Sequence, residues 1–254
     1  MAKLLRVGVL AALFIITMSF MEAGKEPVGK ITFPLNRVFV LQAGSSQPQT
    51  ASYNMDVFSG DKIETKKESR CEITMNNGNV VRIDENSIYT LENVKVTPET
   101  VKAESFLGSG KLWSTIRKIF SKDDYFKVKS PSAVIAVRGT IYRVDVQPDS
   151  TTQLRVYDGE VEVTPYNPSM GALEKTTPGE QPKAIGPPRD VPGPTTVSGP
   201  RDVTMEEWLE IVKAQQQIVV SPDGSFQKSD FNLEDDAKSD WVQWNKQRDE
   251  LLGR

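Results

Sequence analysis

Histidine is missing from all 254 residues of the chain, and cysteine occurs once, at Cys71. Without histidine the chain cannot build Ser-His-Asp or Cys-His nucleophilic sites, and it has no imidazole to act as a general base or a metal ligand. A single thiol also excludes cages of several thiolates and any internal disulfide. Any catalysis would therefore have to use carboxylates, hydroxyls and lysines alone.

Two short motifs combine a hydroxyl group with a lysine. Ser59-Gly60-Asp61-Lys62 has the Ser-x-x-Lys spacing of penicillin-binding enzymes, but Gly60-Asp61 predicts a turn into a strand, and the accompanying Lys-Thr-Gly element is missing. Gly108-Ser109-Gly110-Lys111 ends like a phosphate-binding loop, but Ser105 stands where that motif needs its first glycine. Both motifs are better interpreted as turns.

Paired carboxylates are the one catalytic arrangement that spacing cannot exclude, because Asp and Glu are numerous. We interpret Asp123-Asp124 and Asp235-Asp236 as solvated or capping residues. We therefore expect no enzyme and assign no catalytic residue, cofactor or metal site. A hydrolase that uses carboxylates alone is the least favoured alternative.

Arg138-Gly139-Thr140 is the one candidate site, because it interrupts an apolar region. It follows the apolar run 133–137 and leads into a second run at 141–144. Gly139 predicts a bulge or a close backbone approach. Arg138 is either held within the fold by carbonyls or a carboxylate, the interpretation we favour, or it contacts a ligand or partner.

These residues lie among short strand signals that are separated by turn residues. β-branched or alternating runs occur at residues 38–41, 62–65, 71–75, 80–83, 125–128, 133–137, 141–146, 154–157 and 160–164. Such regular short strands favour a mainly β fold, closed or stacked, over alternating β and α units.

The turn at residues 76–78 can be predicted in detail. A two-residue loop at Asn77-Gly78 would place Arg82 opposite Ile73, on the apolar face. A three-residue loop with a left-handed Gly78 instead places Ile73 opposite Val81, and Cys71 opposite Ile83. We therefore predict a type I turn with a bulge, and we expect Cys71 to be a small buried hydrophobe.

A second hairpin is predicted around Asp158-Gly159. A two-residue type I′ turn there would pair Val156 with Val161 and Leu154 with Val163. All four side chains are apolar and would share one face of the sheet.

The spacing of apolar residues predicts helices in three segments. Leu112, Ile116, Ile119 and Phe120 indicate a short helix inserted among the strands. A capping box at Thr204 and Glu207 begins an amphipathic helix over residues 204–217. A second tail helix runs from Leu233 to Leu251, with Asn232 or Asp230 as its cap.

Composition divides the chain into four parts. Residues 1–23 resemble a secretory signal peptide, with Lys3 and Arg6 before an apolar run at 7–20; uncleaved, this segment would be a membrane anchor. Residues 25–165 form the β domain, 166–203 a Pro- and Gly-rich linker, and 204–254 a helical tail. The tail tryptophans Trp208, Trp241 and Trp244 are expected to pack on the β domain.

The charge balance argues against nucleic acid as a partner. The chain has 31 basic and 34 acidic residues and no basic stripe. Cys71 lies far from the apolar run, so a lipid anchor there is not expected. The bulk of the protein is expected outside the cytoplasm, in the periplasm or at the cell surface.

Several stretches together resemble the sequence pattern of one known family: residues 57–65, 69–73, 77–83, 126–133, 137–144 and 156–163. Over residues 29–164 the chain resembles a FecR domain. The resemblance implies a stacked, mostly antiparallel β-roll or sandwich-like fold without enzymatic activity. In the named regulator this domain lies in the periplasm and passes a signal from an outer-membrane transporter to a cytoplasmic anti-sigma segment. Only about six residues precede the apolar run, so we do not expect the sigma-regulating role.

The function we favour is a non-catalytic, extracytoplasmic binding, sensing or signalling-adaptor module of the bacterial cell envelope. Its partner would be an envelope protein or a cell-wall glycan, and its oligomeric state is left open. The alternative is a structural or wall-associated protein that assembles through edge strands. The tail motif Trp241-x-x-Trp244-Asn245-x-x-Arg248-Asp249 resembles tails of exported FecR-domain proteins, and we assign it no function.

Overall fold

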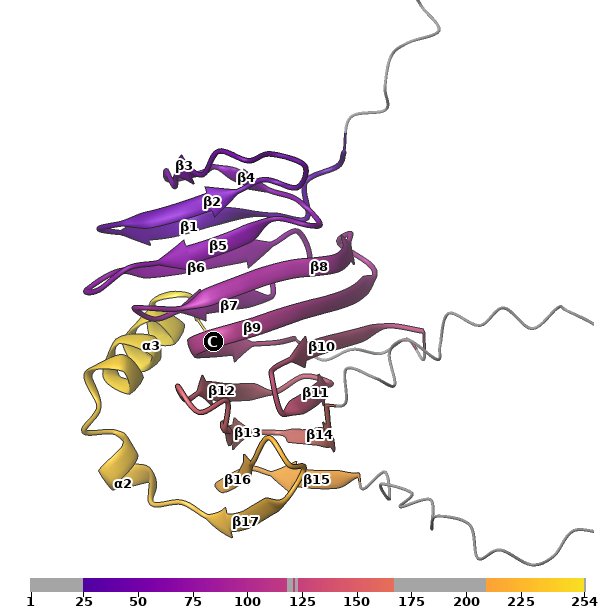
Figure 1. The fold of residues 1–254 in the computed structure, drawn as a ribbon, viewed down its shortest axis with the longest axis vertical. Helices are drawn as coiled ribbons and strands as arrows, with labels where there is room; N and C mark the ends of the chain where they lie inside the picture. Colours follow the sequence, from indigo (N-terminus) through magenta and orange to yellow (C-terminus); the bar gives the residue numbers. More distant parts are fainter. Residues whose placement is uncertain (1–24, 118–120, 122, 167–208, 254) are drawn as a thin grey trace, which may run out of the picture.

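The computed structural model describes residues 25–117, 121, 123–166 and 209–253. These residues form a mainly β structure with seventeen strands and two helices near the C-terminus (Figure 1). β9 (Val101–Thr115) pairs in two sheets, which we call A and B, and joins them into one large mixed sheet. The prediction of a mainly β, stacked fold is confirmed.

Sheet A carries the face on which the C-terminal helices lie. Its strands follow one another in the order β4 (Asp56–Val57), β1 (Gly29–Leu35), β6 (Arg70–Met75), β7 (Val80–Ile83), β9, β12 (Ile141–Val146), β13 (Thr152–Asp158), β16 (Gln216–Val220) and β17 (Phe226–Asp230). All of these pairings are antiparallel. The last two strands come from the C-terminal tail.

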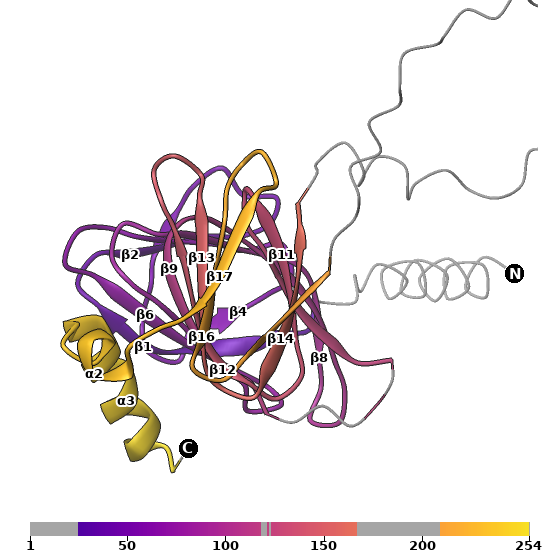
Figure 2. The same cartoon turned by 90° about the horizontal axis from the view of Figure 1, so that it is seen from below.

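Sheet B runs beside it in a similar order. Its strands are β3 (Gln49–Thr50), β2 (Val38–Leu41), β5 (Lys62–Thr65), β8 (Ile88–Val96), β9, β10 (Tyr125–Lys129), β11 (Ala133–Val137), β14 (Glu160–Pro165) and β15 (Glu210–Lys213). The pairing of β9 with β10 is parallel and the others are antiparallel. Seen along the stack, the two sheets lie on either side of a shared interior (Figure 2).

The chain passes repeatedly from one sheet to the other, and each crossing whose loop is fully described contains a residue with positive φ. These residues are Asn36, Asn54, Gly60, Glu68, Asn86, Gly110, Gly139, Gly159 and Gln215. A left-handed residue reverses the local direction of the backbone, and glycine and asparagine adopt this conformation at the lowest cost. The Gly and Asn turn signals in the sequence therefore mark the corners of the stack.

The core lies between the two sheets. Alternate side chains from each strand point into it, and Ile31, Ile73, Leu112, Tyr142 and Ile135 are all fully buried there. Because successive side chains of a strand point to opposite faces, the residues between them lie on the outer face of their sheet.

The hairpin at residues 76–78 is confirmed. Cys71 lies opposite Ile83 and Ile73 opposite Val81, and Gly78 has a φ of 83°. The Cys71 side chain is fully buried, and this burial raises the pKa of its thiol.

The prediction that the two strands flanking Asp158-Gly159 pair with each other is wrong. Gly159 does adopt a positive φ of 83°, but it turns the chain from β13 in sheet A to β14 in sheet B. Val156 therefore pairs with Tyr142, and Val161 pairs with Val137 and Val212. A two-residue Asp-Gly turn signal specifies the backbone conformation, and it does not specify which strands pair around it.

Two predicted helices are strands in the structure. Residues 112–115 belong to β9, where Leu112 enters the core while Trp113 lies on the outer face; residues 118–120 and 122 are outside the described residues. In the tail, β15 and β16 replace the helix expected at 204–217, of which 204–208 are not described. Tertiary pairing decided both cases: residues 112–115 pair with β7 on one side and β12 on the other, and β15 and β16 pair with β14 and β13.

The second tail helix is confirmed in two pieces, α2 (Leu233–Asp236) and α3 (Asp240–Leu251). Asn232 caps α2 by accepting hydrogen bonds from the backbone N–H groups of Glu234 and Asp235. The described helices do not reach the length and apolar character that a membrane crossing requires. The expected signal segment, the linker at 167–203 and Trp208 lie outside the described residues.

Candidate functional site: a polar ladder beneath the C-terminal tail

The outer face of sheet A carries a row of polar side chains at directly opposing positions on neighbouring strands. We call this row the polar ladder; it consists of Glu72, Arg82, Trp113, Arg143, Arg155 and Gln217, on β6, β7, β9, β12, β13 and β16. The ladder exists because each strand places one polar or amphipathic residue at the same level of the stack. The C-terminal tail, residues 209–253, contributes Gln217 to the ladder, and the part of the tail after β17, residues 231–253, covers the ladder.

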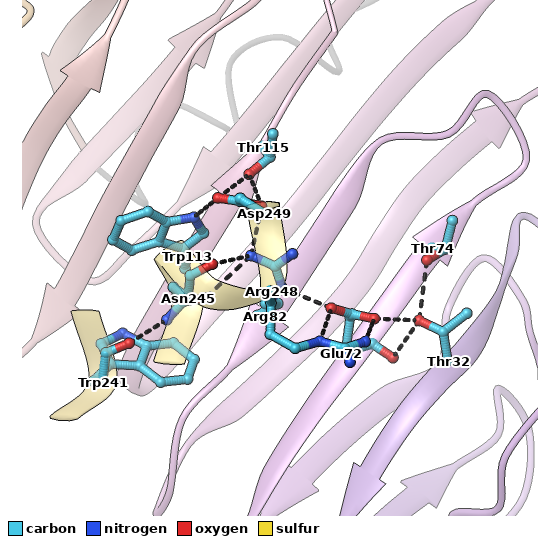
Figure 3. A network of polar contacts seen from close by, with 10 residues as sticks. All are labelled: Thr32, Glu72, Thr74, Arg82, Trp113, Thr115, Trp241, Asn245, Arg248 and Asp249. Atoms are coloured by element: carbon cyan, nitrogen blue, oxygen red, sulfur yellow. Dashed lines mark hydrogen bonds and ion pairs between the residues drawn. The ribbon is translucent and has the colours of Figure 1, made fainter. Parts of the chain in front are cut away.

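Arg82 lies at the centre of the first charged cluster, where α3 contacts the sheet (Figure 3). Its side chain is 0% exposed; Nε donates to Glu72 Oε2 at 2.7 Å, and Nη1 is 2.8 Å from Asp249 Oδ1. Arg248 donates to both carboxylate oxygens of Glu72, at 2.7 and 3.1 Å. Two arginines and two carboxylates thus balance one another away from water, which offsets much of the cost of burying them.

The pKa of Glu72 reflects this balance. Burial disfavours the charged carboxylate, but hydrogen bonds from Arg248 and Arg82 outweigh burial and lower the pKa below its ordinary value. Thr32 donates a further hydrogen bond to Glu72 at 2.9 Å. Glu72 is therefore held in its ionised form.

Asp249 connects the same cluster to β9. It accepts hydrogen bonds from Trp113 Nε1 at 3.2 Å and from Thr115 Oγ1 at 3.2 and 3.3 Å. Asn245 accepts from Arg82 Nη1 through its backbone oxygen at 3.3 Å and donates to the Trp241 carbonyl at 2.7 Å (Figure 3).

A second charged cluster forms where α2 contacts the sheet. Arg143 and Arg155 lie directly opposite each other, and like charges in such a pair repel. Asp236 offsets this repulsion, because its Oδ1 accepts hydrogen bonds from Arg143 Nη1 at 3.0 Å and from Arg155 Nη1 at 3.1 Å. Tyr157 donates to Asp236 Oδ2 at 2.6 Å. The tail thus supplies the carboxylate that the ladder lacks at this point.

Aromatic contacts reinforce the fit of the tail. Trp241 stacks on Trp244, with ring centroids 5.4 Å apart, and Arg70 lies over both rings. On the sheet, Trp113 stacks on Tyr157 at 4.4 Å. The expectation that the tail rings pack on the β domain is confirmed for Trp241 and Trp244.

The tail motif noted in the sequence is the contact face of α3. Trp241, Trp244, Asn245, Arg248 and Asp249 have the spacing i, i+3, i+4, i+7 and i+8, which places them on one side of a helix. All five contact the sheet or one another in the clusters above. That spacing, together with single charges inside apolar strands, was the sequence signal for this site.

A cavity of about 480 Å³ remains between the ladder and the tail. It is lined by Lys111, Arg143, Asp145, Arg155, Gln217, Asp230, Phe231, Asn232, Asp235, Asp236, Ser239 and Trp241. Arg143 lies between two of these carboxylates and pairs with Asp145 at 3.1 Å as well as with Asp236. In the described part of the chain, no group of three or more potential metal ligands occurs.

Comparison with known proteins agrees with this architecture. The family described as FecR protein matches residues 61–162. The chain contains a FecR domain. No curated protein matches the chain.

Two crystal structures of a candidate anti-sigma factor from Parabacteroides distasonis ATCC 8503, at 1.65 and 2.50 Å resolution, also resemble the chain. Each is 16% identical in sequence, with TM-scores of 0.43 and 0.44, and the match covers 68% of this chain. The chain spans 61% of the length of that protein.

The FecR match divides the candidate site into two parts. Five ladder residues, from Glu72 to Arg155, lie within residues 61–162, and the whole tail lies outside them. The FecR domain therefore provides the polar surface, and an additional segment of the same chain covers it.

The predicted motif Arg138-Gly139-Thr140 lies apart from the ladder, at a corner of the FecR domain. Gly139 has a φ of 76° and turns the chain from β11 into β12. Thr140 is buried; its Oγ1 donates to the Glu160 carbonyl, and its own carbonyl accepts from Ile116 N, both at 3.0 Å. Arg138 is exposed, so it is not held inside the fold as we favoured. Contact of Arg138 with a ligand or partner stays a prediction.

The other motifs have structural roles. Asp61 is buried and accepts hydrogen bonds from Ala43 N and Phe58 N, which fixes the turn before β5. Ser59 Oγ accepts from Val94 N at 3.0 Å. Residues 108–111 form the bend of β9 between the two sheets.

Proposed function

We propose that this protein is a non-catalytic binding and sensing module of the bacterial cell envelope, located outside the cytoplasm. Its binding surface is the region where the tail covers the polar ladder of the FecR domain. Its partner is an envelope protein or a cell-wall glycan.

The observation that carries this proposal is the pairing of charges between two separate parts of the chain. Asp236 and Asp249 of the tail meet Arg143, Arg155 and Arg82 of the ladder, and they enclose a charged cavity. Charged contacts of this kind give specific recognition and define a unique docked state. The absence of histidine and the regulatory character of the FecR family support binding over catalysis.

Crosslinking in living cells tests the proposal. A photoreactive amino acid replaces Lys111, whose side chain at the cavity rim is 45% exposed, and in a matched variant it replaces Tyr53, which is 75% exposed and lies between β3 and β4. We expect the probe at position 111 to capture one defined envelope protein, or glycan, that the probe at position 53 does not capture. Equal capture by both probes, or capture of nothing, would contradict the proposal.

A second candidate function, assembly through edge strands, is favoured by β15. Within the part of the chain that the structure describes, this strand pairs with β14 on one side only, and it exposes Ile211 (45%) and the adjoining Leu209 (57%). An unpaired edge with exposed apolar side chains can pair with another copy. Light scattering of the purified chain distinguishes the two functions. Oligomers that disappear in Ile211→Lys would support assembly, and a monomer at every concentration would eliminate it.

A further inference from the structure

The cavity between the polar ladder and the tail has the size of a small-molecule site. Its volume of about 480 Å³ falls within the range typical of ligand pockets, roughly 300 to 1,000 Å³. Its walls come from five neighbouring strands of sheet A, which are β9, β12, β13, β16 and β17, and from the segment that runs from the end of β17 into the first turn of α3. Ligands commonly bind between two such separately folded parts of a protein.

Three buried polar atoms of the lining residues have no hydrogen-bond partner among the described residues. They are Arg143 Nε, Asp145 Oδ1 and Trp241 Nε1. Each residue is more than nine-tenths buried, so leaving these groups without partners is costly. Two of the atoms are N–H donors and the third is a carboxylate acceptor.

The charges around the cavity are mixed and nearly balanced. Lys111, Arg143 and Arg155 are cationic, and Asp145, Asp230, Asp235 and Asp236 are anionic. Four carboxylates would repel a polyanion such as a phosphate ester. Three cations would repel a polyamine. A ligand that carries one charge of each sign fits this lining better than either.

The aromatic rings of the cavity do not offer a platform for a sugar. Trp241 is 2% exposed, stacks on Trp244 and lies beneath Arg70. Phe231 meets the ring of Tyr157 edge to face and lies beneath Arg155. Stacking of a sugar ring needs an open aromatic face, so the charged groups rather than the rings must provide recognition.

We infer that this cavity binds a small zwitterion of amino-acid or dipeptide size, which carries one carboxylate and one ammonium group. Arg143 Nε and Trp241 Nε1 are closed off from solvent in the unliganded structure, so these two side chains turn toward the cavity on binding and donate hydrogen bonds to the carboxylate. The ammonium donates to Asp145 Oδ1. This inference rests on the proposed binding function and specifies its ligand class.

The site also connects ligand binding to the position of the tail. Arg143 and Asp145 belong to the FecR domain, whereas Trp241 belongs to α3. A ligand that contacts all three therefore joins the tail to the sheet. Occupancy of the cavity would strengthen the docked state of the tail by the free energy of binding.

Calorimetric titration of the full chain with L-alanyl-L-alanine tests the inference. N-acetyl-L-alanyl-L-alanine lacks the ammonium group and L-alanyl-L-alanine amide lacks the carboxylate, so these compounds are matched controls; glucose and inorganic phosphate represent the other ligand classes. We expect saturable binding of the dipeptide, weakened roughly tenfold or more by either blocking group, because each removes a charged hydrogen bond. Equal binding of the blocked forms, tighter binding of glucose or phosphate, or no dipeptide binding at millimolar concentration would overturn the inference.

Variants locate the binding within the cavity. Asp145→Asn removes the charge but keeps the shape of the side chain, and burial raises the pKa of Asp145 even opposite Arg143. Asp145→Asn and Lys111→Met at the rim should each weaken dipeptide binding. Asp223→Asn, in the exposed turn between β16 and β17, should leave it unchanged. Unchanged binding in both cavity variants would overturn the inference even if one of them folded poorly.

The proposed binding function and the proposed ligand class can be contradicted independently of each other. Capture of an envelope partner from position 111, without dipeptide binding, would retain the binding module and remove this ligand class. Dipeptide binding without any captured partner would retain the ligand site and remove the macromolecular partner.

Discussion

Arg82 shows how single residues determine the behaviour of this protein. It lies between apolar residues of β7, and its partners Glu72, Asp249 and Asn245 come from a neighbouring strand and from α3. A buried charge is tolerated only when its partners are in place, because its desolvation otherwise costs several kcal/mol. The ion pairs therefore fix the position at which α3 docks.

Replacing Arg82 by Met should destabilise the protein by about 3–5 kcal/mol, because Glu72 and Asp249 lose their shared buried cation. The free energy of unfolding, from chemical denaturation, measures this loss. Lys30→Met is the matched control: the pair of Lys30 with Asp56 is nearly half exposed and should contribute less than about 1 kcal/mol. Equal losses in the two variants would show that the buried cluster contributes no more than a surface pair.

Glu72 should make stability depend on pH. Its pKa in the folded protein lies below the ordinary value of 4.5, so the ionised carboxylate stabilises the fold at and above that pH. This contribution should disappear as the pH falls below 4.5 and through the lower folded pKa. Melting temperatures from neutral pH downward should fall less steeply in acid for Glu72→Gln, although that variant is less stable at neutral pH. Parallel curves for the two proteins would contradict this assignment.

At the scale of elements, turns were predicted better than strand partners. The sequence predicted left-handed glycines at 78 and 159, and both have positive φ. The first closes a hairpin within sheet A, and the second carries the chain into sheet B. Local sequence sets the backbone angles of a turn, whereas the choice between hairpin and corner depends on strands distant in sequence.

The bend of β9 depends on Gly110. It has a φ of 85°, and a Cβ there would meet Ser87 Oγ at 2.0 Å and Ser87 Cα at 2.7 Å. Gly110→Ala should therefore cost more than the roughly 1–2 kcal/mol of left-handed strain alone. Gly44→Ala isolates that strain, because Gly44 has a φ of 84° and no atom within 4 Å of its added Cβ. Denaturation of both variants gives the comparison, and similar losses would mean that β9 relaxes around the added methyl group.

At the scale of the whole molecule, the sequence predicted the β domain but not the ladder. The alternation of apolar and polar residues identified most of the strands, because this alternation is a local pattern. The ladder depends on the register between six strands that span residues 72 to 217, and no local pattern records that register. The tail strands were missed for the same reason, since β15 and β16 are stable only against β14 and β13.

The tail helices α2 and α3 should open separately from the two sheets. Asp236 and Asp249 pair them with the ladder, together with Arg248 and a small apolar cluster around Trp241, whereas the core between the sheets is larger, apolar and continuous. In the double variant Asp236→Asn/Asp249→Asn, Arg155 loses its pair with Asp236, and Arg143 keeps Asp145 as its carboxylate partner. Segments with few apolar contacts open at lower free energy than the core, so the loss should fall on α2 and α3.

Hydrogen exchange of the full chain measures this opening. Amide protons of α3 should exchange about tenfold faster or more in the double variant, because charged hydrogen bonds are lost at both clusters, while those of β6 and β7 should change much less. Asp235→Asn is the control: of the described residues, only the exposed Lys238 forms an ion pair with Asp235, so this variant should leave the α3 rates unchanged. If hydrogen exchange were accelerated equally in α3, β6 and β7, the tail helices and the FecR domain would unfold together. The helices could then not move as a separate unit.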